Sequence, residues 1–249
     1  MTSPHCHKLF EQLSDQPFAS AGIRPGGLDL TRRGLVLARL APGDAVLDVG
    51  CGTGVTVRYL VHEYAIRALG LDASSFLVAQ GKAGDTALPI LTGDAQALPF
   101  VDESFDGVFL ECMLSLVLDR VQVLQECCRI LKPHGRIIVT DLYARNPEAI
   151  EALRGLSVRS CLRGALDKDR FLRECSASGF GFACFEDHSD LLRDFAVQMI
   201  WTYGALDRFW TEAGKCAVCS GKVHQTVREA KPGYFLLVGF KARRLHKLF

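Results

Sequence analysis

Short apolar runs alternate with helical patterns through the first half of the chain. The run at 46–49 is apolar and β-branched and is followed by three alternating glycines, so it predicts a strand, a tight turn and a helix over 55–64. Further strands are predicted at 66–71, 88–92, 105–110 and 136–140. Strand and helix in this rhythm indicate right-handed parallel crossovers, with ligands at the carboxyl ends of the strands.

Capping residues predict where the helices begin. Asp29 is placed to cap a helix that runs to about residue 40, and Ser74 or Ser75 to cap one that runs to about residue 82. Asp119 starts another helix, whose apolar residues recur at helical spacing. These residues are Val121, Leu124, Cys128 and Leu131.

The second half of the chain predicts more helix before the strands resume. One helical pattern runs from 147 to about 161, and a second begins at Asp167. Strands are expected at 182–186 and 234–241, with a long, largely apolar helix over 189–213 between them. The sequence has neither an internal repeat nor a low-complexity linker, so residues 1–249 are expected to form a single domain.

Gly50, Gly52 and Gly54 follow the first predicted strand at alternate positions. Glycine adopts positive φ and has no Cβ, so a ligand can lie directly against the main chain of such a turn. The dinucleotide fingerprint is G-x-G-x-x-G, with its third glycine one residue later than here. The spacing therefore favours a cofactor other than NAD, although a Rossmann-type oxidoreductase stays open as an alternative.

Asp48 and the glycine turn together resemble the first motif of class I S-adenosylmethionine-dependent methyltransferases, an acid followed by G-x-G-x-G. The strand at 66–71 ends in Asp72, where an acid that accepts from ribose hydroxyls is expected. Later segments follow the order of the family: Gly93-Asp94-Ala95, Phe105 to Leu110 and Leu131 to Arg136. Residues 30 to 142 are thus similar to these enzymes, in particular to type 11 and ubiquinone-menaquinone methyltransferase-like proteins.

This resemblance implies S-adenosyl-L-methionine as the cofactor and S-adenosylhomocysteine as its product. It implies that Asp48 orients the amino group of the donor, Asp72 accepts from the ribose hydroxyls and Asp94 accepts from the adenine amine. The implied cofactor-binding residues are Asp48, Gly50, Cys51, Gly52, Gly54, Asp72, Ala73, Asp94, Ala95 and Glu111. The N-terminus of the helix over 55–64 is expected to point at the carboxylate of the methionine moiety.

The resemblance also implies the fold class. We expect an α/β, Rossmann-like class I methyltransferase fold, with a seven-stranded, mostly parallel sheet, an antiparallel last strand and a small helical cap. Residues 142–180 are where a substrate cap enters this fold. Residues 1–28 are expected to form a leader that either folds over the cofactor as a lid or stays a flexible terminus. Acceptor specificity is expected to lie in residues 142 to 215 and in the leader.

Methyl transfer is an in-line displacement at a sulfonium carbon, so the protein must hold donor and acceptor in register and keep water out. The reaction requires no metal, and it requires a base only when the acceptor is protonated at rest. Catalytic candidates near the expected cleft are Glu111, Asp141, Tyr143 and Cys161. For Glu111 and Asp141, a structural role at a helix end or in a rim ion pair is an equal alternative.

A second resemblance concerns Asp141 to Ala144 and the segment 156–166. Both are similar to the corresponding region of arsenite methyltransferases, in which a cysteine shortly before Gly-Ala-Leu holds As(III). Cys161 matches that cysteine. The resemblance implies that Cys161 holds arsenite or another soft, thiol-bound acceptor, with Cys216 or Cys219 as second ligand. The alternative is that Cys161 only packs under the cap.

Composition and charge narrow the partners. Hydrophobic residues make up 49% of the 249 positions, which is ample for a buried core. The 29 basic and 28 acidic residues give a net charge of +1, so no net field favours nucleic acid or an anionic membrane. Apolar runs of the length of a secretory signal or a membrane span do not occur. We therefore expect a cytoplasmic protein with a small-molecule acceptor, without nucleic acid or membrane as a partner, and leave its oligomeric state open.

Ten cysteines without a signal peptide indicate reduced thiols rather than a disulfide framework. Cys216 and Cys219 form one C-x-x-C, but a structural zinc site normally needs four ligands, so loop thiols are favoured and no metal site is predicted. The sequence predicts a methyltransferase that uses S-adenosylmethionine and acts on a small molecule. A non-catalytic protein that binds S-adenosylmethionine stays open as a further alternative.

Overall fold

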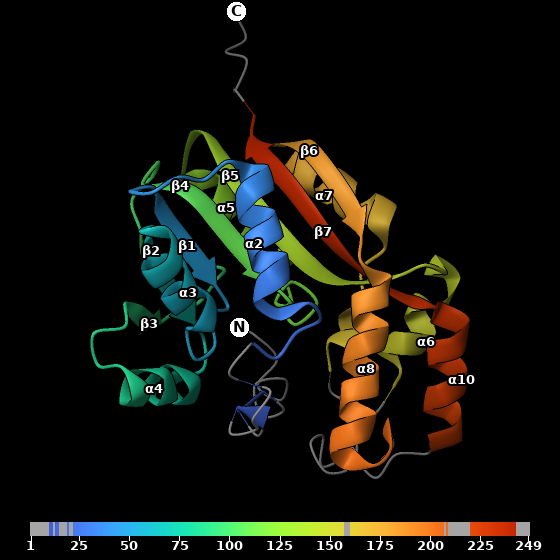
Figure 1. Cartoon of the computed structure of the whole chain (residues 1–249). Coiled ribbons are helices and arrows are strands. Elements are labelled where there is room, and N and C mark those ends of the chain that lie inside the picture. Colours follow the sequence, from blue (N-terminus) through green and yellow to red (C-terminus); the bar gives the residue numbers. More distant parts are fainter. Residues whose placement is uncertain are drawn as a thin grey trace, which may run out of the picture.

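Seven strands form one sheet in the part of the chain that the structure describes (Figure 1). This computed structural model describes residues 10–11, 13–14, 19, 22–156, 160–206, 208 and 220–242. The strands are β1 (Ala45–Val49), β2 (Arg67–Asp72), β3 (Ile90–Thr92), β4 (Phe105–Glu111), β5 (Leu131–Ala144), β6 (Phe180–Asp187) and β7 (Pro232–Lys241). Their order across the sheet is β3-β2-β1-β4-β5-β7-β6.

β7 lies between β5 and β6 and runs antiparallel to both, whereas the other neighbouring strands pair in parallel. The predicted fold class, a mostly parallel seven-stranded sheet with an antiparallel last strand, is therefore confirmed. β5 is longer than the predicted strand at 136–140. Its first residue, Leu131, pairs with Phe105 of β4, and its last, Ala144, pairs with Pro232 of β7.

Helices cover both faces of the sheet. α2 (Gly27–Ala38) and α3 (Val55–Tyr64) pack on one face, and α5 (Arg120–Ile130) and α7 (Lys168–Ala177) pack on the other. Successive residues of β1 point to opposite faces, so Val46 joins the core under α2 and α3 while Leu47 joins the core under α5 and α7. A strand buried on both faces needs a nearly continuous apolar run, which is why the run at 46–49 predicted β1.

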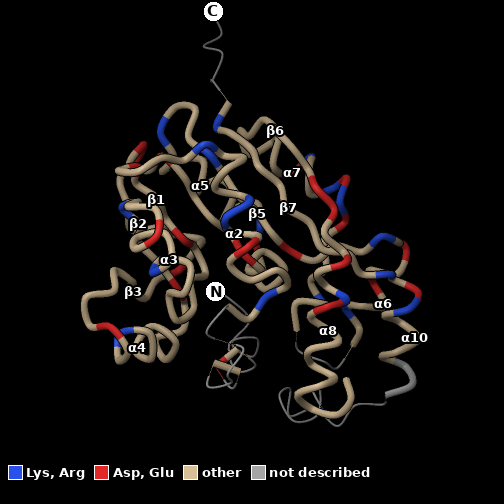
Figure 2. The backbone as a smooth tube through the Cα atoms, in the orientation of Figure 1, with Lys and Arg blue, Asp and Glu red and all other residues tan. Residues whose placement is uncertain are grey.

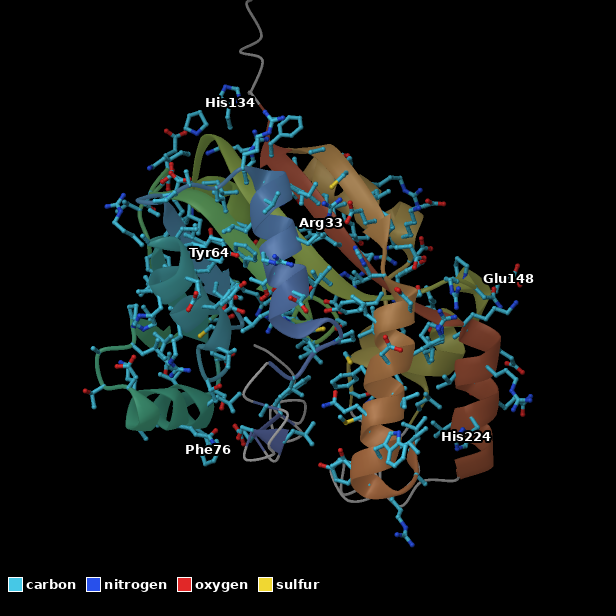
Figure 3. All side chains as sticks on the ribbon, in the orientation of Figure 1. Arg33, Tyr64, Phe76, His134, Glu148 and His224 are labelled. Atoms are coloured by element: carbon cyan, nitrogen blue, oxygen red, sulfur yellow. The ribbon has the colours of Figure 1, made fainter. Side chains whose placement is uncertain are left out.

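Exposed ion pairs contribute little to the stability of the packed sheet and helices. Basic and acidic residues are interspersed along the described chain (Figure 2). One ion pair joins α2 to β6, where Arg33 Nη2 lies 2.6 Å from Glu186 Oε1 (Figure 3). Since an exposed pair of this kind is worth at most about 1 kcal/mol, the fold depends on the two apolar cores.

Further helices lie at the lower right of Figure 1, below the sheet. They are η2 (Pro147–Ala149), α6 (Ile150–Arg154), η3 (Cys161–Gly164), α8 (Ser189–Tyr203) and α10 (Ser220–Ala230). α4 (Ser75–Gly84) packs beside β3 and β2. The described part of the N-terminal segment lies between α4 and α8 in this view.

The cap helices differ from their predictions. The helix predicted over 147–161 is broken, because α6 ends at Arg154 and is followed by Gly155, a poor helix former. α8 ends at Tyr203 rather than near 213, because Gly204 adopts a φ of 80°, the left-handed conformation that ends helices. α10 was not predicted at all.

Two helix details also need correction. Asp29 lies in the first turn of α2 and does not cap it, since the N-cap is Gly26. Asp119 caps α5 as predicted and accepts from the N–H of Gln122 at 3.0 Å. The buried side of α5 differs from the side predicted to be buried, because a second set of apolar residues in this helix also recurs at helical spacing. This set is Val123, Leu124, Cys127 and Ile130.

Candidate functional site

The glycine turn joins β1 to α3 at the carboxyl end of β1. Gly50, Gly52 and Gly54 have φ angles of 80°, 55° and 79°, all in the left-handed region that glycine tolerates. The N–H groups of Gly50 and Cys51 donate to the carbonyl of Leu71 at 2.7 and 3.2 Å, which ties the turn to β2. A Cβ built on Gly52 would meet no protein atom within 4 Å. At Gly52 the main chain of the turn is therefore not covered by a side chain and faces the adjoining space.

Asp72 holds the turn from the carboxyl end of β2. Its Oδ2 accepts from the N–H of Gly52 at 2.8 Å, and its Oδ1 accepts from the N–H of Ser74 at 2.8 Å. Each carboxylate oxygen has further lone-pair capacity after one hydrogen bond. Asp72 therefore fixes the turn and still presents acceptor capacity to a ligand beside it.

A first cavity lies beside the turn, with an empty volume of about 970 Å³ that includes space open to solvent. It occupies the carboxyl ends of β1, β2 and β4, where the crossover pattern predicted a ligand. Most of the predicted cofactor-binding residues line it, namely Gly50, Cys51, Gly52, Asp72, Ala73, Ala95 and Glu111.

The other three predicted residues support the wall rather than line it. Asp48 is buried at the end of β1. Gly54 is the N-cap of α3. Asp94 lies between two lining residues, but its Oδ1 accepts from the N–H of Gln96 at 2.9 Å, and this hydrogen bond lowers the pKa of Asp94.

Arg24, which the sequence did not single out, also lines the first cavity. Its Nη2 lies 2.9 Å from Glu111 Oε2 and donates to the hydroxyls of Thr31 and Thr56 at 2.7 and 2.8 Å. Thr31 and Thr56 in turn donate to the two oxygens of Glu111, at 2.7 and 2.8 Å. This network joins the segment before α2 to α2, α3 and β4.

Both oxygens of Glu111 are engaged in this network, so the geometry favours a positioning role for Glu111 over that of a base. Burial raises the pKa of Asp48 well above its ordinary value, and the negative charge of Glu111 adds to this while Arg24 opposes it. The Nε of Arg24 has no hydrogen-bond partner among the described residues although it is buried. The cavity wall thus combines buried acids with one cationic donor that has unused capacity.

A second cavity adjoins the first, with an empty volume of about 1000 Å³ that again includes space open to solvent. Phe10, Ile23 and Cys112 line both cavities. The rest of its wall comes from segments far apart in the sequence, including η3, α8 and α10. Ligands bound in the two cavities would therefore meet beside Phe10, Ile23 and Cys112.

The predicted catalytic candidates separate in the structure. Cys161 lines the second cavity, and Glu111 lines the first. Tyr143 and Asp141 line neither. The hydroxyl of Tyr143 donates to Asp187, and the pKa of Tyr143 is raised by burial and by this bond. Asp141 is fully buried and accepts from the N–H groups of Ser115 and Leu142 at 2.9 and 2.7 Å.

Cys112 and Cys161 bring two thiols to the second cavity. Cys112 has a φ of 54°, and its Sγ lies 2.9 Å from Tyr234 Oη. Burial raises the pKa of Cys112 well above its ordinary value, so this group is a thiol at neutral pH. Gly164 lets η3 approach the loop after β4 closely, because a Cβ there would lie 1.7 Å from the Ser115 carbonyl oxygen.

Other predicted ligands fall elsewhere. Cys216 and Cys219, expected as second ligand of a soft acceptor, lie outside the described residues. Among the described residues, no group of three or more His, Cys, Asp or Glu side chains is arranged to hold a metal ion.

Two groups of functional residues escaped the sequence argument. Arg24 stands alone between Gly22 and Pro25, and the only signal was an isolated cation in a Gly/Pro-rich segment directly before a helix. Of the wall of the second cavity, the sequence analysis singled out only Cys161, because the apolar residues of the wall have the same pattern as any packed helix.

The sheet order, the bare glycine turn and the cavity beside it define a class I methyltransferase fold. In agreement with this class, residues 47–139 match the family described as a methyltransferase domain.

Individual relatives support the same class. A demethylmenaquinone methyltransferase of Beutenbergia cavernae is 34% identical over 138 residues, which are 55% of this chain and 57% of the relative. The chain spans about half the length of the curated relatives that it matches first.

Solved structures match a larger share of the chain. The [4+2]-cyclase SpnF has a TM-score of 0.68 at 21% identity and covers 96% of this chain and 93% of its own. Phosphoethanolamine N-methyltransferase 2 of Haemonchus contortus, in complex with S-adenosyl-L-methionine, has a TM-score of 0.66 at 18% identity and covers 94% and 60%. At these identities the match concerns the fold, and a fold alone does not decide the reaction.

The length and the hydropathy of the described helices bear on whether any of them could cross a membrane. None of them has both the length and the apolar character that crossing a membrane requires. The cytoplasmic location stays a prediction.

Proposed function

We propose that the protein is an S-adenosylmethionine-dependent methyltransferase that acts on a small-molecule acceptor. The feature that supports this function most is the glycine turn at 50–54, whose backbone is bare toward the first cavity at Gly52 and is held there by Asp72. The methyltransferase family match of residues 47–139 covers this turn. The acceptor is taken to occupy the second cavity, which meets the first at Cys112.

The residues of the first cavity fit the cofactor. The carboxylate of Asp72 is an acceptor for ribose hydroxyls, and Ala95 with Asp94 beside it borders the adenine. Arg24 is the only Lys or Arg among the described residues that line this cavity, so its guanidinium is the group that would pair with the carboxylate of the methionine moiety. When bound, S-adenosylmethionine supplies a methyl group attached to a positively charged sulfur.

The chain itself contributes position and the exclusion of water. Met113, Leu116 and Val117 add apolar side chains to the wall of the first cavity. Thr31, Thr56 and Glu111 hold the segment around Arg24 against α2 and α3. Holding two reactants in register in a dry site is the main requirement of an in-line methyl transfer.

Proton removal has few candidates on the acceptor side. The titratable side chains among the described residues lining the second cavity are Cys112, Cys161 and His224. A base for an acceptor that loses a proton would come from Cys161 or His224, because the raised pKa keeps Cys112 a thiol at neutral pH. An acceptor atom with a lone pair free at rest would need none of them.

The cofactor assignment is tested on purified protein. Mass spectrometry of the retained ligand and calorimetric titrations with S-adenosylmethionine, S-adenosylhomocysteine and NAD are the measurements. We expect the two S-adenosyl compounds to bind and NAD to show no binding. Binding of NAD alone would assign the chain to the oxidoreductases instead.

A soft, thiol-bound acceptor such as arsenite is a second candidate, favoured by the presence of Cys161 and Cys112 in one cavity wall. Cys161→Ser nearly preserves volume and removes the soft donor. The rate of S-adenosylhomocysteine release with arsenite and glutathione is expected to fall in Cys161→Ser. Absence of arsenite-dependent release in the wild type would end this second candidate and leave the first unchanged.

A further inference from the structure

The wall of the second cavity is almost entirely hydrocarbon. α8 contributes Leu192, Phe195, Ala196 and Met199, and α10 contributes Val223 and Val227. Among the described residues that line this cavity there is no Asp, Glu, Lys or Arg, and His224 of α10 is exposed (Figure 3). The first cavity, in contrast, contains Arg24, Asp72 and Glu111.

This composition selects against charged occupants. A phosphate, carboxylate or ammonium group that leaves water must be paired, and an unpaired ion in an apolar site is strongly disfavoured. The described wall offers no ionic partner for such a group. An uncharged molecule gains from the same wall, because apolar area is removed from water on both sides.

One polar group in the wall is unsatisfied. Ser160 is 2% exposed, lines the second cavity, and its Oγ has no hydrogen-bond partner among the described residues. A buried hydroxyl without a partner is unfavourable in the empty protein, so a ligand that supplies the partner gains affinity. Ser160 directly precedes η3, which Gly164 brings against the loop after β4.

The residues shared by the two cavities, Cys112 among them, indicate how the acceptor is oriented in the second cavity. Cys112, Phe10 and Ile23 line both cavities, so the atom that receives a methyl group would lie at the end of the second cavity that these three residues border. Cys161 is close enough to Cys112 to raise the pKa of its thiol. The apolar side chains of α8 and α10 then surround the remainder of the molecule.

We infer that the methyl acceptor is an uncharged, mostly hydrocarbon small molecule, with its body between α8 and α10 and one hydrogen-bonding group at Ser160. This substrate class rests on the proposed methyltransferase function and makes it more specific. It separates the chain from enzymes whose acceptors carry a phosphate or a carboxylate.

The first experiment uses N-phenyl-1-naphthylamine, an uncharged fluorophore, titrated into protein saturated with S-adenosylhomocysteine. Phosphoethanolamine, titrated by calorimetry, is the charged counterpart. We expect fluorescence enhancement with saturation for the first compound and no binding for the second. Binding of phosphoethanolamine without binding of the fluorophore would overturn the inference.

Two neighbouring positions of α8 give a matched pair of variants. Ala196 lines the cavity, and Val197 is 49% exposed on the same helix. Ala196→Glu places a charge in the apolar wall and is expected to weaken fluorophore binding at least about tenfold, since an unpaired buried charge is costly. Val197→Glu is expected to stay within about twofold of the wild type. Ala196→Phe, which fills the cavity without charge, is expected to weaken binding as well.

Equal behaviour of Ala196→Glu and Val197→Glu would mean that the fluorophore binds elsewhere and would overturn the inference. Calorimetry with S-adenosylhomocysteine on the same samples reports folding and the first cavity separately. If the wild type fails to bind S-adenosylhomocysteine, the proposed function fails. If it binds S-adenosylhomocysteine but not the fluorophore, only the substrate class fails.

Ser160 is tested with two competitors that differ by one hydroxyl, naphthalene and 1-naphthol. The wild type is expected to favour 1-naphthol by about 2- to 12-fold more than Ser160→Ala does, which corresponds to a hydrogen bond of about 0.5–1.5 kcal/mol. An unchanged ratio in Ser160→Ala would remove Ser160 from the site.

Discussion

Gly52→Ala adds one methyl group at the position where the main chain is bare toward the first cavity. Its Cβ would meet no protein atom within 4 Å, so the only steric conflict is with a ligand. Gly43 provides a matched control, because it also has a positive φ, 87°, and also has nothing within 4 Å of a built Cβ. It lies in the turn before β1 and does not line the first cavity.

The expected magnitudes follow from strain and from overlap. Alanine at positive φ costs about 1–2 kcal/mol, so both variants are expected to lose about 2–8 °C in melting temperature without ligand. S-adenosylhomocysteine at 100 times its dissociation constant stabilises the wild type by about 2.7 kcal/mol, or about 5–11 °C. Overlap of a methyl group with the ligand costs about 1–3 kcal/mol, which weakens the affinity for S-adenosylhomocysteine about 5- to 150-fold. At the same ligand concentration, the ligand then stabilises Gly52→Ala by only about 0.3–1.8 kcal/mol.

The assay is thermal unfolding of wild type, Gly52→Ala and Gly43→Ala, each with and without S-adenosylhomocysteine at one fixed concentration. Gly43→Ala is expected to keep the full ligand-induced shift from its lowered starting point. Gly52→Ala is expected to lose about a third to nine tenths of it. Equal ligand-induced shifts in the two variants would show that the ligand does not lie against Gly52, and the placement of the cofactor would be refuted.

Three further predictions concern the acids around the first cavity. Asp72→Ala is expected to weaken S-adenosylmethionine binding by about 1.5–3 kcal/mol in calorimetry, because a carboxylate hydrogen bond to the ligand is lost. Burial and Glu111 raise the pKa of Asp48 above its ordinary value of 3.8, so the folded state binds this proton more tightly than the unfolded state does. The free energy of unfolding is therefore expected to fall as pH rises from about 4 through the raised pKa, and urea titrations of Asp48→Asn are expected to lack this decline. Arg24→Met leaves buried Glu111 without its cation and is expected to lower the free energy of unfolding by about 3 kcal/mol in urea titrations. The double variant Arg24→Met with Glu111→Leu is expected to recover part of that loss. Additive losses of the two single variants would contradict a coupling between Arg24 and Glu111.

The strands were predictable because burial on both faces leaves a strong local pattern. β1, β2 and β4 are largely apolar runs, and each has an acid at its last or second-last residue, at the edge where the cofactor is expected. The glycine turn was equally visible, since positive φ at alternate positions requires a particular residue type. The cofactor side of the site was therefore accessible from sequence.

The acceptor side was not accessible, for a physical reason. An apolar wall has no residue type of its own, and Phe195 or Val223 would look the same if they packed in a solid core. Only the tertiary arrangement of α8, α10 and η3 leaves space between them. Arg24 was missed on similar grounds, because its role depends on contacts with Thr31, Thr56 and Glu111 that only the tertiary structure brings together.

The position of β7 in the sheet has a consequence for how the chain folds as it is synthesised. β6 has a single neighbour in the sheet, and that neighbour is β7, which follows every other described strand in the sequence. Strands β1 to β5 can pair with one another as they leave the ribosome, but β6 must wait until residues 232–241 have emerged. Until then its backbone donors and acceptors, and those on the outer edge of β5, are open to pairing with another chain. Aggregation is therefore most probable before the last pairing step, in which β7 inserts between β5 and β6.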